Sequence, residues 1–221
     1  MLQFLQLERK ARISVMLTVR ADGTKELPFV LINRRRAVKG LEQFERSLHI
    51  YYCGRTNWFN NTSTAAYLTA IFHSRQTRPR LLVWDMFTAH TSDSTQNKCA
   101  DLNVHTVTVP GGCTGLVQPA DVSCNKPFKA HLETKYATWM ATGERSFTRT
   151  GRRRAPSYHT LCEWIVSAWA SISRDLIIKS FMVCGVSIAV DGTEDSTIKC
   201  LCDTANGLSL LESESAQLTQ N

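Results

Sequence analysis

The apolar residues near the start of the chain fall into two short runs. The first, ISVMLTV at positions 13–19, is rich in β-branched residues, which favour strands. The pair Asp22-Gly23 follows and is typical of a tight turn, and a second apolar run, LPFVLIN, occupies positions 27–33. We therefore expect a β-hairpin over residues 12–33.

Apolar runs and helix-like spacings alternate through the middle of the chain. The run LLVW between Arg80 and Asp85 is short and continuous, which is typical of a strand buried on both faces. The segment 37–60 has no clean period and predicts no element. The other predicted elements are a helix over 63–73 that starts at Ser63 or Thr64, a helix over 93–100, a strand over 104–109 and a helix from Pro119 to about Met140. Strands that alternate with helices predict an α/β fold in layers.

The last third of the chain has a different pattern. Residues 141–157 are polar and arginine-rich, and we expect a loop or a linker there. From Leu161 to Leu176, apolar residues recur at i, i+3 and i+4, which predicts an amphipathic helix. Its tryptophans are expected in the core, with a partner groove as the alternative. The acidic and polar segment from about 203 onward is expected to be frayed or disordered.

The composition is that of a globular protein. The chain has 221 residues, of which 43% are hydrophobic and 20% are charged, and this length suits one domain with or without appendages. No apolar run approaches the ~18 to 20 residues that a membrane-spanning helix needs. Because the start, MLQFLQLERK, shows no signal-peptide pattern, we expect neither a secreted nor an integral-membrane protein. The eight cysteines are then interpreted as reduced thiols, and their spacing supports no zinc site.

Charge is distributed unevenly along the chain. The 26 basic and 19 acidic side chains give a net charge of +7. Residues 1–160 carry 23 basic and 11 acidic residues, a net charge of +12, whereas residues 161–221 carry 3 and 8, a net charge of −5. A basic body suits a surface that binds a polyanion, and plain solubility is the alternative. The cluster Arg34-Arg35-Arg36 is either a short basic signal or solvated loop charge.

Two acidic residues lie where an α/β fold places its ligand sites. Asp85 ends the buried strand, and the carboxyl ends of strands border the crevice in which α/β sheets bind ligands. Asp121 lies in the first turn of the helix that follows the Pro110-Gly111-Gly112 turn. Each acid also has a structural explanation, since carboxylates cap helices and stabilise their first turns. Taken singly, each acid is better explained by structure than by chemistry.

Longer strings make the chain similar to a known family. They are ADGTKELPFVLINRR, LLVWDMFTAHTSDS, VTVPGGCTGLVQPADVSCNKPFK and IIKSFMVCGVSIAVDGTEDS. Together they resemble the DDE-type transposase domain of the pogo/Tigger/Jerky group over about residues 12–202. The resemblance implies a ribonuclease-H-like fold, in which helices flank a mixed sheet. It also implies three carboxylates that hold two divalent metal ions, magnesium or manganese, for cutting DNA and transferring its ends.

The resemblance assigns roles to individual residues. Asp85 matches the second acid and Asp121 the third, so both are implied to be catalytic residues and metal ligands. The implied supporting residues are His90, Gln118 and Asn125, and the expected DNA-binding residues are Lys126, Lys129, Arg34, Arg35 and Arg36. A basic side chain near these acids would neutralise the phosphates of the DNA backbone.

The family's first acid has no match in this chain. In the family it lies on the central strand, upstream of the segment that matches residues 12–33. Glu8 and Asp22 are the only acids before position 26, and neither is expected to reach the crevice, because Asp22 belongs to the hairpin turn and Glu8 aligns with a loop. We therefore expect an N-terminally truncated fold without the central first strand, and catalysis that is weak or absent. An open sheet edge would invite a partner chain or a second copy.

These inferences predict the following organisation and function. The expected divisions are a partial catalytic core over 1–140, a basic loop over 141–157, a helical part of the same domain over 158–202 and a tail over 203–221. The first functional hypothesis is a DNA-binding, catalytically impaired endonuclease domain, active only with magnesium or manganese. The alternative is a non-catalytic nuclear module that binds DNA or assembles with proteins. Both predict a nuclear protein, with DNA as the partner and no membrane contact.

Overall fold

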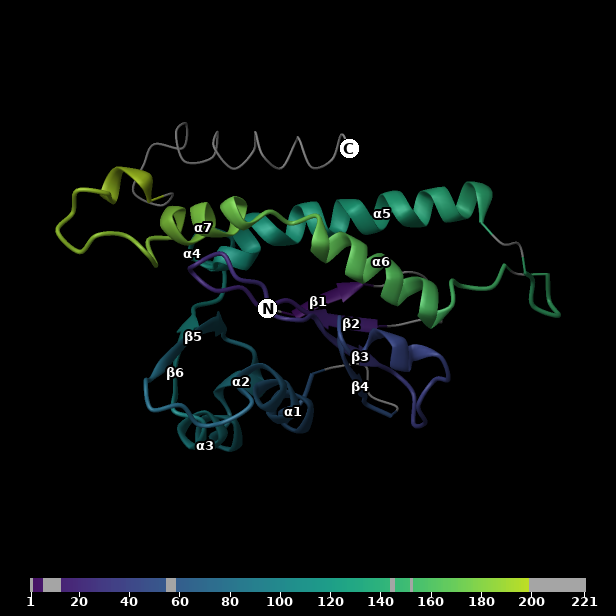
Figure 1. The fold of residues 1–221 in the computed structure, drawn as a ribbon, viewed down its shortest axis with the longest axis horizontal. Coiled ribbons are helices and arrows are strands. Elements are labelled where there is room, and N and C mark those ends of the chain that lie inside the picture. The colour runs from purple at the N-terminus through teal and green to yellow at the C-terminus, as the bar shows by residue number, and fades with distance from the viewer. Residues whose placement is uncertain (1, 6–12, 55–58, 144–145, 152, 199–221) are drawn as a thin grey trace.

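The predicted α/β architecture is confirmed. In the computed structural model, which describes residues 2–5, 13–54, 59–143, 146–151 and 153–198, strands form two sheets, and helices cover the larger sheet on both sides (Figure 1). The prediction that the run LLVW is buried on both faces is wrong, because Leu81 is 61% exposed. The predicted tail over 203–221 and Glu8 lie outside the described residues. Within the described residues, no helix is long and apolar enough to cross a membrane.

The larger sheet has four strands and mixed directions. In spatial order the strands are β1 (Leu2–Leu5), β2 (Ile13–Met16), β3 (Phe29–Ile32) and β4 (His49–Tyr52). Strand β2 is antiparallel to both β1 and β3, and β4 is parallel to β3. The predicted hairpin is therefore confirmed, and Gly23 takes the positive φ of +84° that its turn requires. Strand β4 was not predicted, since its four residues are all half-buried and show no alternation.

The second sheet pairs β5 (Arg80–Asp85) with β6 (Val104–Val109) in parallel. Helix α3 (Asp93–Asp101) connects them, as predicted. The short helix α2 (Thr88–Thr91), which comes directly after β5, was not predicted because one turn is too short to show a period. Since β5 and β6 are parallel, Asp85 stands at the carboxyl end of this sheet.

Helix α1 (Asn61–Phe72) begins two residues before the predicted start. The reason is a capping box: the Asn60 side chain accepts from the Ser63 backbone N–H at 3.0 Å, and the Ser63 hydroxyl accepts from the Asn60 N–H at 2.9 Å.

The helix predicted from Pro119 to Met140 consists of two parts. A π-helical turn, η2 (Ala120–Cys124), leads into α5 (Asn125–Thr142). The one-turn helix α4 (Thr114–Val117) precedes them and joins them to β6. Single π-turns inside helices occur often at functional sites, and this one contains Asp121.

The helix predicted over 161–176 is also two helices, α6 (Tyr158–Ala170) and α7 (Arg174–Val183). Ser173 separates them, because its side chain accepts a 3.1 Å hydrogen bond from the Leu176 N–H and so begins a new helix. The apolar period runs through the break, which explains why the sequence predicts one helix. The short helices η1 (Leu41–Phe44) and η3 (Asp195–Thr197) complete the fold.

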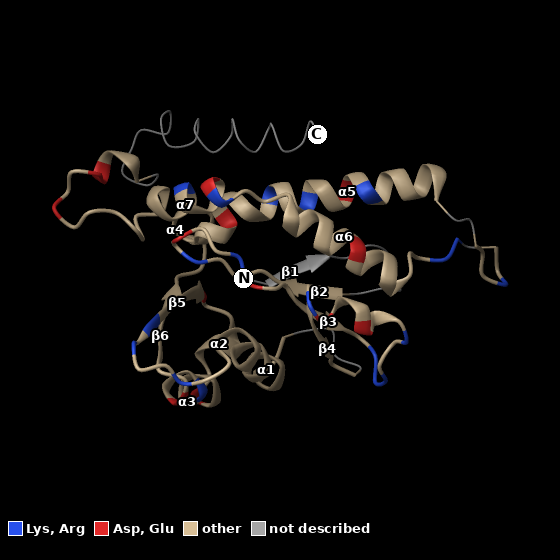
Figure 2. Ribbon diagram, viewed as in Figure 1, with Lys and Arg blue, Asp and Glu red and all other residues tan. Residues whose placement is uncertain are grey.

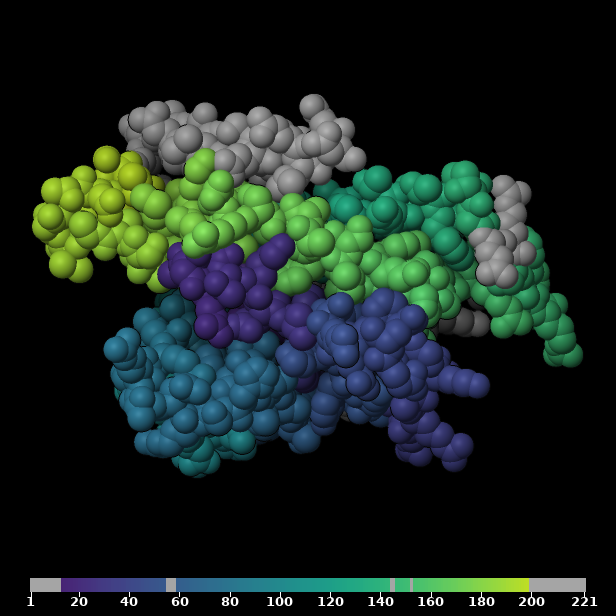
Figure 3. All heavy atoms as spheres, in the orientation of Figure 1, coloured from purple at the N-terminus to yellow at the C-terminus, as the bar shows by residue number. Residues whose placement is uncertain are grey.

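The β2–β3 hairpin is buried on both faces. Val15 and Ile32 contribute to a core under α5, α6 and α7, and Met16 and Leu31 contribute to a second core with α1 and β5. Figure 3 accordingly shows the purple segment that begins at residue 13 between the helices drawn in green and the block drawn in teal. This central position explains why all eight residues of β2 and β3 are buried.

Candidate active site

Asp85 is held by a histidine from the next helical turn. The Nδ1 atom of His90 lies 2.8 Å from Asp85 Oδ1 and 3.2 Å from the Asp85 carbonyl oxygen. Helix α2 brings His90 back to the strand end, where its N–H donates to the Phe87 carbonyl at 2.8 Å. One imidazole nitrogen therefore fixes both the side chain and the backbone of Asp85.

Aromatic rings fix the orientation of His90. Its side chain is fully buried, and its ring stacks on Trp84 at a centroid distance of 4.1 Å and an interplanar angle of 2°. The Phe87 ring contacts it edge-on at 5.4 Å. Trp84 is thus a site residue that was not predicted. No spacing identifies it, because its contact with His90 depends on how α2 turns back toward β5.

The surroundings of Asp85 favour its ionised form. Burial acts to raise the pKa of Asp85, but the hydrogen bond and the electrostatic attraction of His90, with the Phe87 N–H, outweigh burial and hold that pKa below its ordinary value. The Asp85 side chain is still 27% exposed, so a ligand can reach it.

Asp121 is held on the π-helical turn by its two neighbours from the predicted set. The Asn125 amide donates to Asp121 Oδ1 at 2.8 Å. The Gln118 carbonyl accepts from the N–H groups of Asp121 and Val122 at 2.9 and 3.0 Å, and so anchors the start of η2. The structure therefore brings His90 to one acid, and Gln118 and Asn125 to the other.

The surroundings of Asp121 favour its neutral form. Burial raises the pKa of Asp121, and the charge of Asp85 raises it further, against the opposing effects of the Asn125 hydrogen bond and the positive charge of Lys129. The neighbouring residues Trp84 and Ala120 line the same cavity, so the strand end that carries Asp85 and the turn that carries Asp121 lie close together. Two carboxylates with opposite pKa shifts thus share one region of the molecule.

The predicted DNA-binding residues lie in two separate places. Lys126 and Lys129 are exposed on α5, directly after the Asp121 turn. The exposed cluster Arg34–Arg36 lies on the loop after β3, where the Arg34 guanidinium lies 5.7 Å from the centroid of the Tyr158 ring at the start of α6. Figure 2 shows this loop at the opposite end of the molecule from β5 and α4. The structure therefore brings only the lysines to the acids.

A divalent metal ion would find two carboxylates here. Asp121 Oδ2 and Gln118 Oε1 are buried and lack a hydrogen-bond partner among the described residues, and oxygen atoms are the ligands that magnesium prefers. However, no group of three or more His, Cys, Asp and Glu residues that could hold a metal ion occurs within the described part of the chain. Asp22 lies in the hairpin turn and accepts a 2.8 Å hydrogen bond from the Thr24 N–H. Among the described residues, the acids around Asp85 and Asp121 therefore do not form a three-carboxylate site.

Comparison with known proteins identifies relatives of this chain. The family described as DDE superfamily endonuclease matches residues 10–181. Two proteins named "Pogo transposable element with KRAB domain" are similar over 190 residues, at 28% identity for the human and 30% for the mouse protein. The alignments cover 84% of this chain and 31% of each relative, so the chain spans about a third of their length.

The fold has a counterpart among solved structures. The catalytic domain of Mos1 mariner transposase superposes with a TM-score of 0.50 over 83% of this chain and 74% of that domain. The sequence identity is 11%, so this likeness concerns the fold alone. The mixed α/β arrangement therefore resembles that of a transposase catalytic domain.

Proposed function

The chain belongs to the DDE superfamily endonucleases, and from that premise we propose that it is a transposase-derived domain that binds DNA and is catalytically impaired. What supports this proposal is the family match over residues 10–181, together with Asp85 at the end of β5 and Asp121 on the turn that leads into α5 and its exposed lysines. The impairment follows from the absence of a third acid among the described residues around this pair.

The DDE family uses divalent metal ions. Magnesium or manganese, when bound, would stabilise the attacking and leaving oxygens of a phosphoryl displacement. Asp85 and Asp121 are the residues that would hold such an ion, His90 would orient Asp85, and Asn125 and Gln118 would orient Asp121. Because two carboxylates give fewer ligands than the family's three, we expect weak cation binding and derive no cutting step for this chain.

The separation of the two sheets supports a further part of the proposal. We infer that this is a ribonuclease-H-like fold in which β1 covers Ile13–Met16 of β2, and no described strand joins the larger sheet to β5. In the described residues no pairing joins the four-stranded sheet to the β5–β6 pair. The four divisions expected from the sequence, with residues 158–202 as part of the same domain, stay part of this proposal, and so does a nuclear location.

Salt dependence of DNA binding tests the main claim. Binding of the full chain to a labelled DNA duplex, followed by fluorescence anisotropy, should weaken as salt rises. The slope of log K against log salt is negative, and exchange of Lys126 and Lys129 for Gln should make it less steep by about 2. Each lost phosphate contact reduces the steepness by about 1. Lys98→Gln on α3 is the matched control. Undetectable or salt-insensitive binding would refute the proposal, and an unchanged slope would refute the role of the two lysines.

Nicking of plasmid DNA tests the impairment. With magnesium or manganese, the purified chain should nick no faster than its Asp85→Asn and Asp121→Asn variants. Nicking that both variants abolish would show a working site and overturn the impaired part of the proposal. For the alternative, a module that only binds DNA or assembles with proteins, the affinity for DNA should not change when a chelator is added.

A further inference from the structure

Strand β5 is paired on one edge only within the described part of the chain. The Arg80 N–H donates to the Asn103 carbonyl at 3.2 Å, so residues 80, 82 and 84 turn their backbone groups toward β6. Successive residues of a strand use opposite edges. Leu81 and Val83 therefore direct their N–H and C=O groups away from β6, where no described strand pairs with them.

A second unpaired edge belongs to the segment that continues β2. Thr18 and Arg20 bond to the returning arm of the hairpin, through Glu26 N–H to Thr18 C=O at 3.0 Å and Arg20 N–H to Thr24 C=O at 2.9 Å. Val19 lies between them, opposite Lys25, so its own N–H and C=O point to the other edge. Strand β1 pairs with Ile13–Met16, and no other described strand pairs with the Val19 edge.

The two open edges border the same cavity, which has a volume of about 400 Å³. Leu17–Ala21 line it on one side and Arg80–Trp84 on the other. Helix α1 contributes Tyr67 and Ile71 to its wall, and the segments around α7 and η2 contribute further apolar side chains, namely Phe181, Val186, Pro119 and Ala120. Its occupant would therefore be extended and apolar on both faces, like a strand in the middle of a covered sheet.

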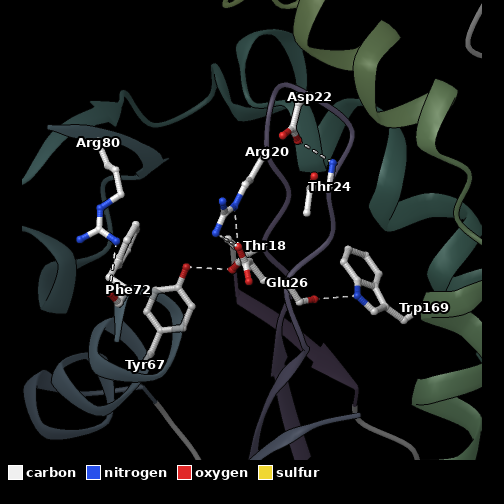
Figure 4. Close-up of polar contacts among 9 residues, drawn as sticks. All are labelled: Thr18, Arg20, Asp22, Thr24, Glu26, Tyr67, Phe72, Arg80 and Trp169. Carbon is white, nitrogen blue, oxygen red and sulfur yellow. Dashed lines mark hydrogen bonds and ion pairs between the residues drawn. The ribbon is translucent and has the colours of Figure 1, made fainter. Parts of the chain in front are cut away.

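One cation at this cavity lacks an acidic partner. The Arg80 guanidinium donates to the carbonyls of Phe72, Ser74 and Leu102, and it forms no ion pair among the described residues. Arg20, across the cavity, is already paired with Glu26. Figure 4 shows Arg80 on one side of Tyr67 and the Arg20–Glu26 pair on the other. A carboxylate on the occupant would complement Arg80.

We propose that this cavity is an acceptor site for an extended strand of a partner polypeptide, aliphatic at consecutive positions and carrying one carboxylate toward Arg80. The strand pairs with the Val19 edge and the Val83 edge and joins the two sheets into one. Strand addition takes its affinity from backbone hydrogen bonds and its specificity from side-chain pockets. The inference rests on the cavity and its edges and is independent of the proposed DNA binding.

Peptide binding to the full chain tests the proposal. The probe is a fluorescein-labelled peptide with valine and isoleucine at its central positions, one glutamate and a lysine tail. We expect saturable binding that falls about tenfold or more when alternate backbone amides of the peptide are N-methylated, because methylation removes the strand donors and keeps the side chains. Exchange of its glutamate for glutamine should also weaken binding. Equal binding of the N-methylated peptide, or no saturable binding, would overturn the proposal.

Two proline variants locate the site. Val83→Pro removes the N–H that faces the cavity, whereas Thr108→Pro removes one on the outer edge of β6 and is the matched control. Val83→Pro should weaken peptide binding about tenfold, and Thr108→Pro should change it less than about twofold, with thermal unfolding as the check that both fold. Equal effects would refute the site. Sedimentation that shows a dimer broken by Val83→Pro, without peptide binding, would assign the cavity to a second copy and refute a partner chain.

Discussion

The contact between His90 and Asp85 leads to a prediction about charge and stability. In a His90→Phe variant an aromatic ring still fits against Trp84, so the stacking at 4.1 Å is largely kept while the Nδ1 contact to Asp85 is lost. Burial then acts on Asp85 without the opposing effect of the imidazole. The pKa of Asp85 should therefore change from below its ordinary value to above it.

The size of the effect follows from the kind of bond that is lost. A hydrogen bond to a charged group contributes roughly 1.5 to 3 kcal/mol. Since the Asp85 side chain is 27% exposed and water partly replaces the lost donor, we expect the lower end of that range. A double-mutant cycle of His90→Phe with Asp85→Asn should thus give a coupling energy of about 1.5 kcal/mol near pH 7.

The pH dependence has a definite sign. The pKa of Asp85 is lower in the folded than in the unfolded chain, so its contribution to stability is present above the ordinary pKa of about 3.9 and is lost as the pH falls through the folded-state value. Urea unfolding of the four proteins of the cycle would measure the coupling energy at each pH, and NMR of ¹³C-labelled aspartate would measure the pKa. A coupling energy near zero at neutral pH, or an unchanged pKa of Asp85 in His90→Phe, would refute the reasoning.

Three other predictions concern single residues. Asn125→Ala should raise the pKa of Asp121 further, because the amide hydrogen bond opposes the effect of burial, and carboxyl NMR would measure this pKa. The free energy of unfolding of the variant should also fall more steeply as the pH rises between the unfolded-state and folded-state pKa values of Asp121. Gly23→Ala should destabilise the fold by about 1 kcal/mol or more, since a positive φ strains alanine and the new Cβ would clash with the Arg174 side chain. Urea unfolding would measure the loss, and an unchanged free energy of unfolding would show that the turn relaxes and would contradict the prediction. Phe128→Ala, at a fully buried core position, should lower the free energy of unfolding by about 3 to 5 kcal/mol in the same assay, and a loss below about 1 kcal/mol would contradict the packing described.

Local patterns predict much of this fold. The Asp22-Gly23 turn between two β-branched runs fixes the hairpin, and the run before Asp85 ends where the strand ends. These signals work because turn residues and side-chain alternation act over a few neighbours. Where a second local signal competes, the pattern fails, as at Ser173, whose cap divides a continuous apolar period into two helices.

The cavity could not be predicted, because it depends on contacts between distant segments. Its lining comes from the extension of β2, from α1, from β5 and from the region of η2 and α7, which are separated by up to about 170 positions. The continuous apolar run Leu81–Trp84 predicts a strand buried on both faces, yet Leu81 is 61% exposed, because such a run does not say which neighbour covers each face and edge. The open edge therefore becomes visible only in the folded chain.

The two acids show the same distinction at the candidate site. Strand end and helix start predict the positions of Asp85 and Asp121, yet they do not predict which acid is more readily ionised. That difference arises from partners: Asp85 faces an imidazole, whereas Asp121 faces an amide and the charge of Asp85. An amide hydrogen bond cannot compensate for both burial and a neighbouring carboxylate, so the pKa of Asp121 is raised while that of Asp85 is lowered.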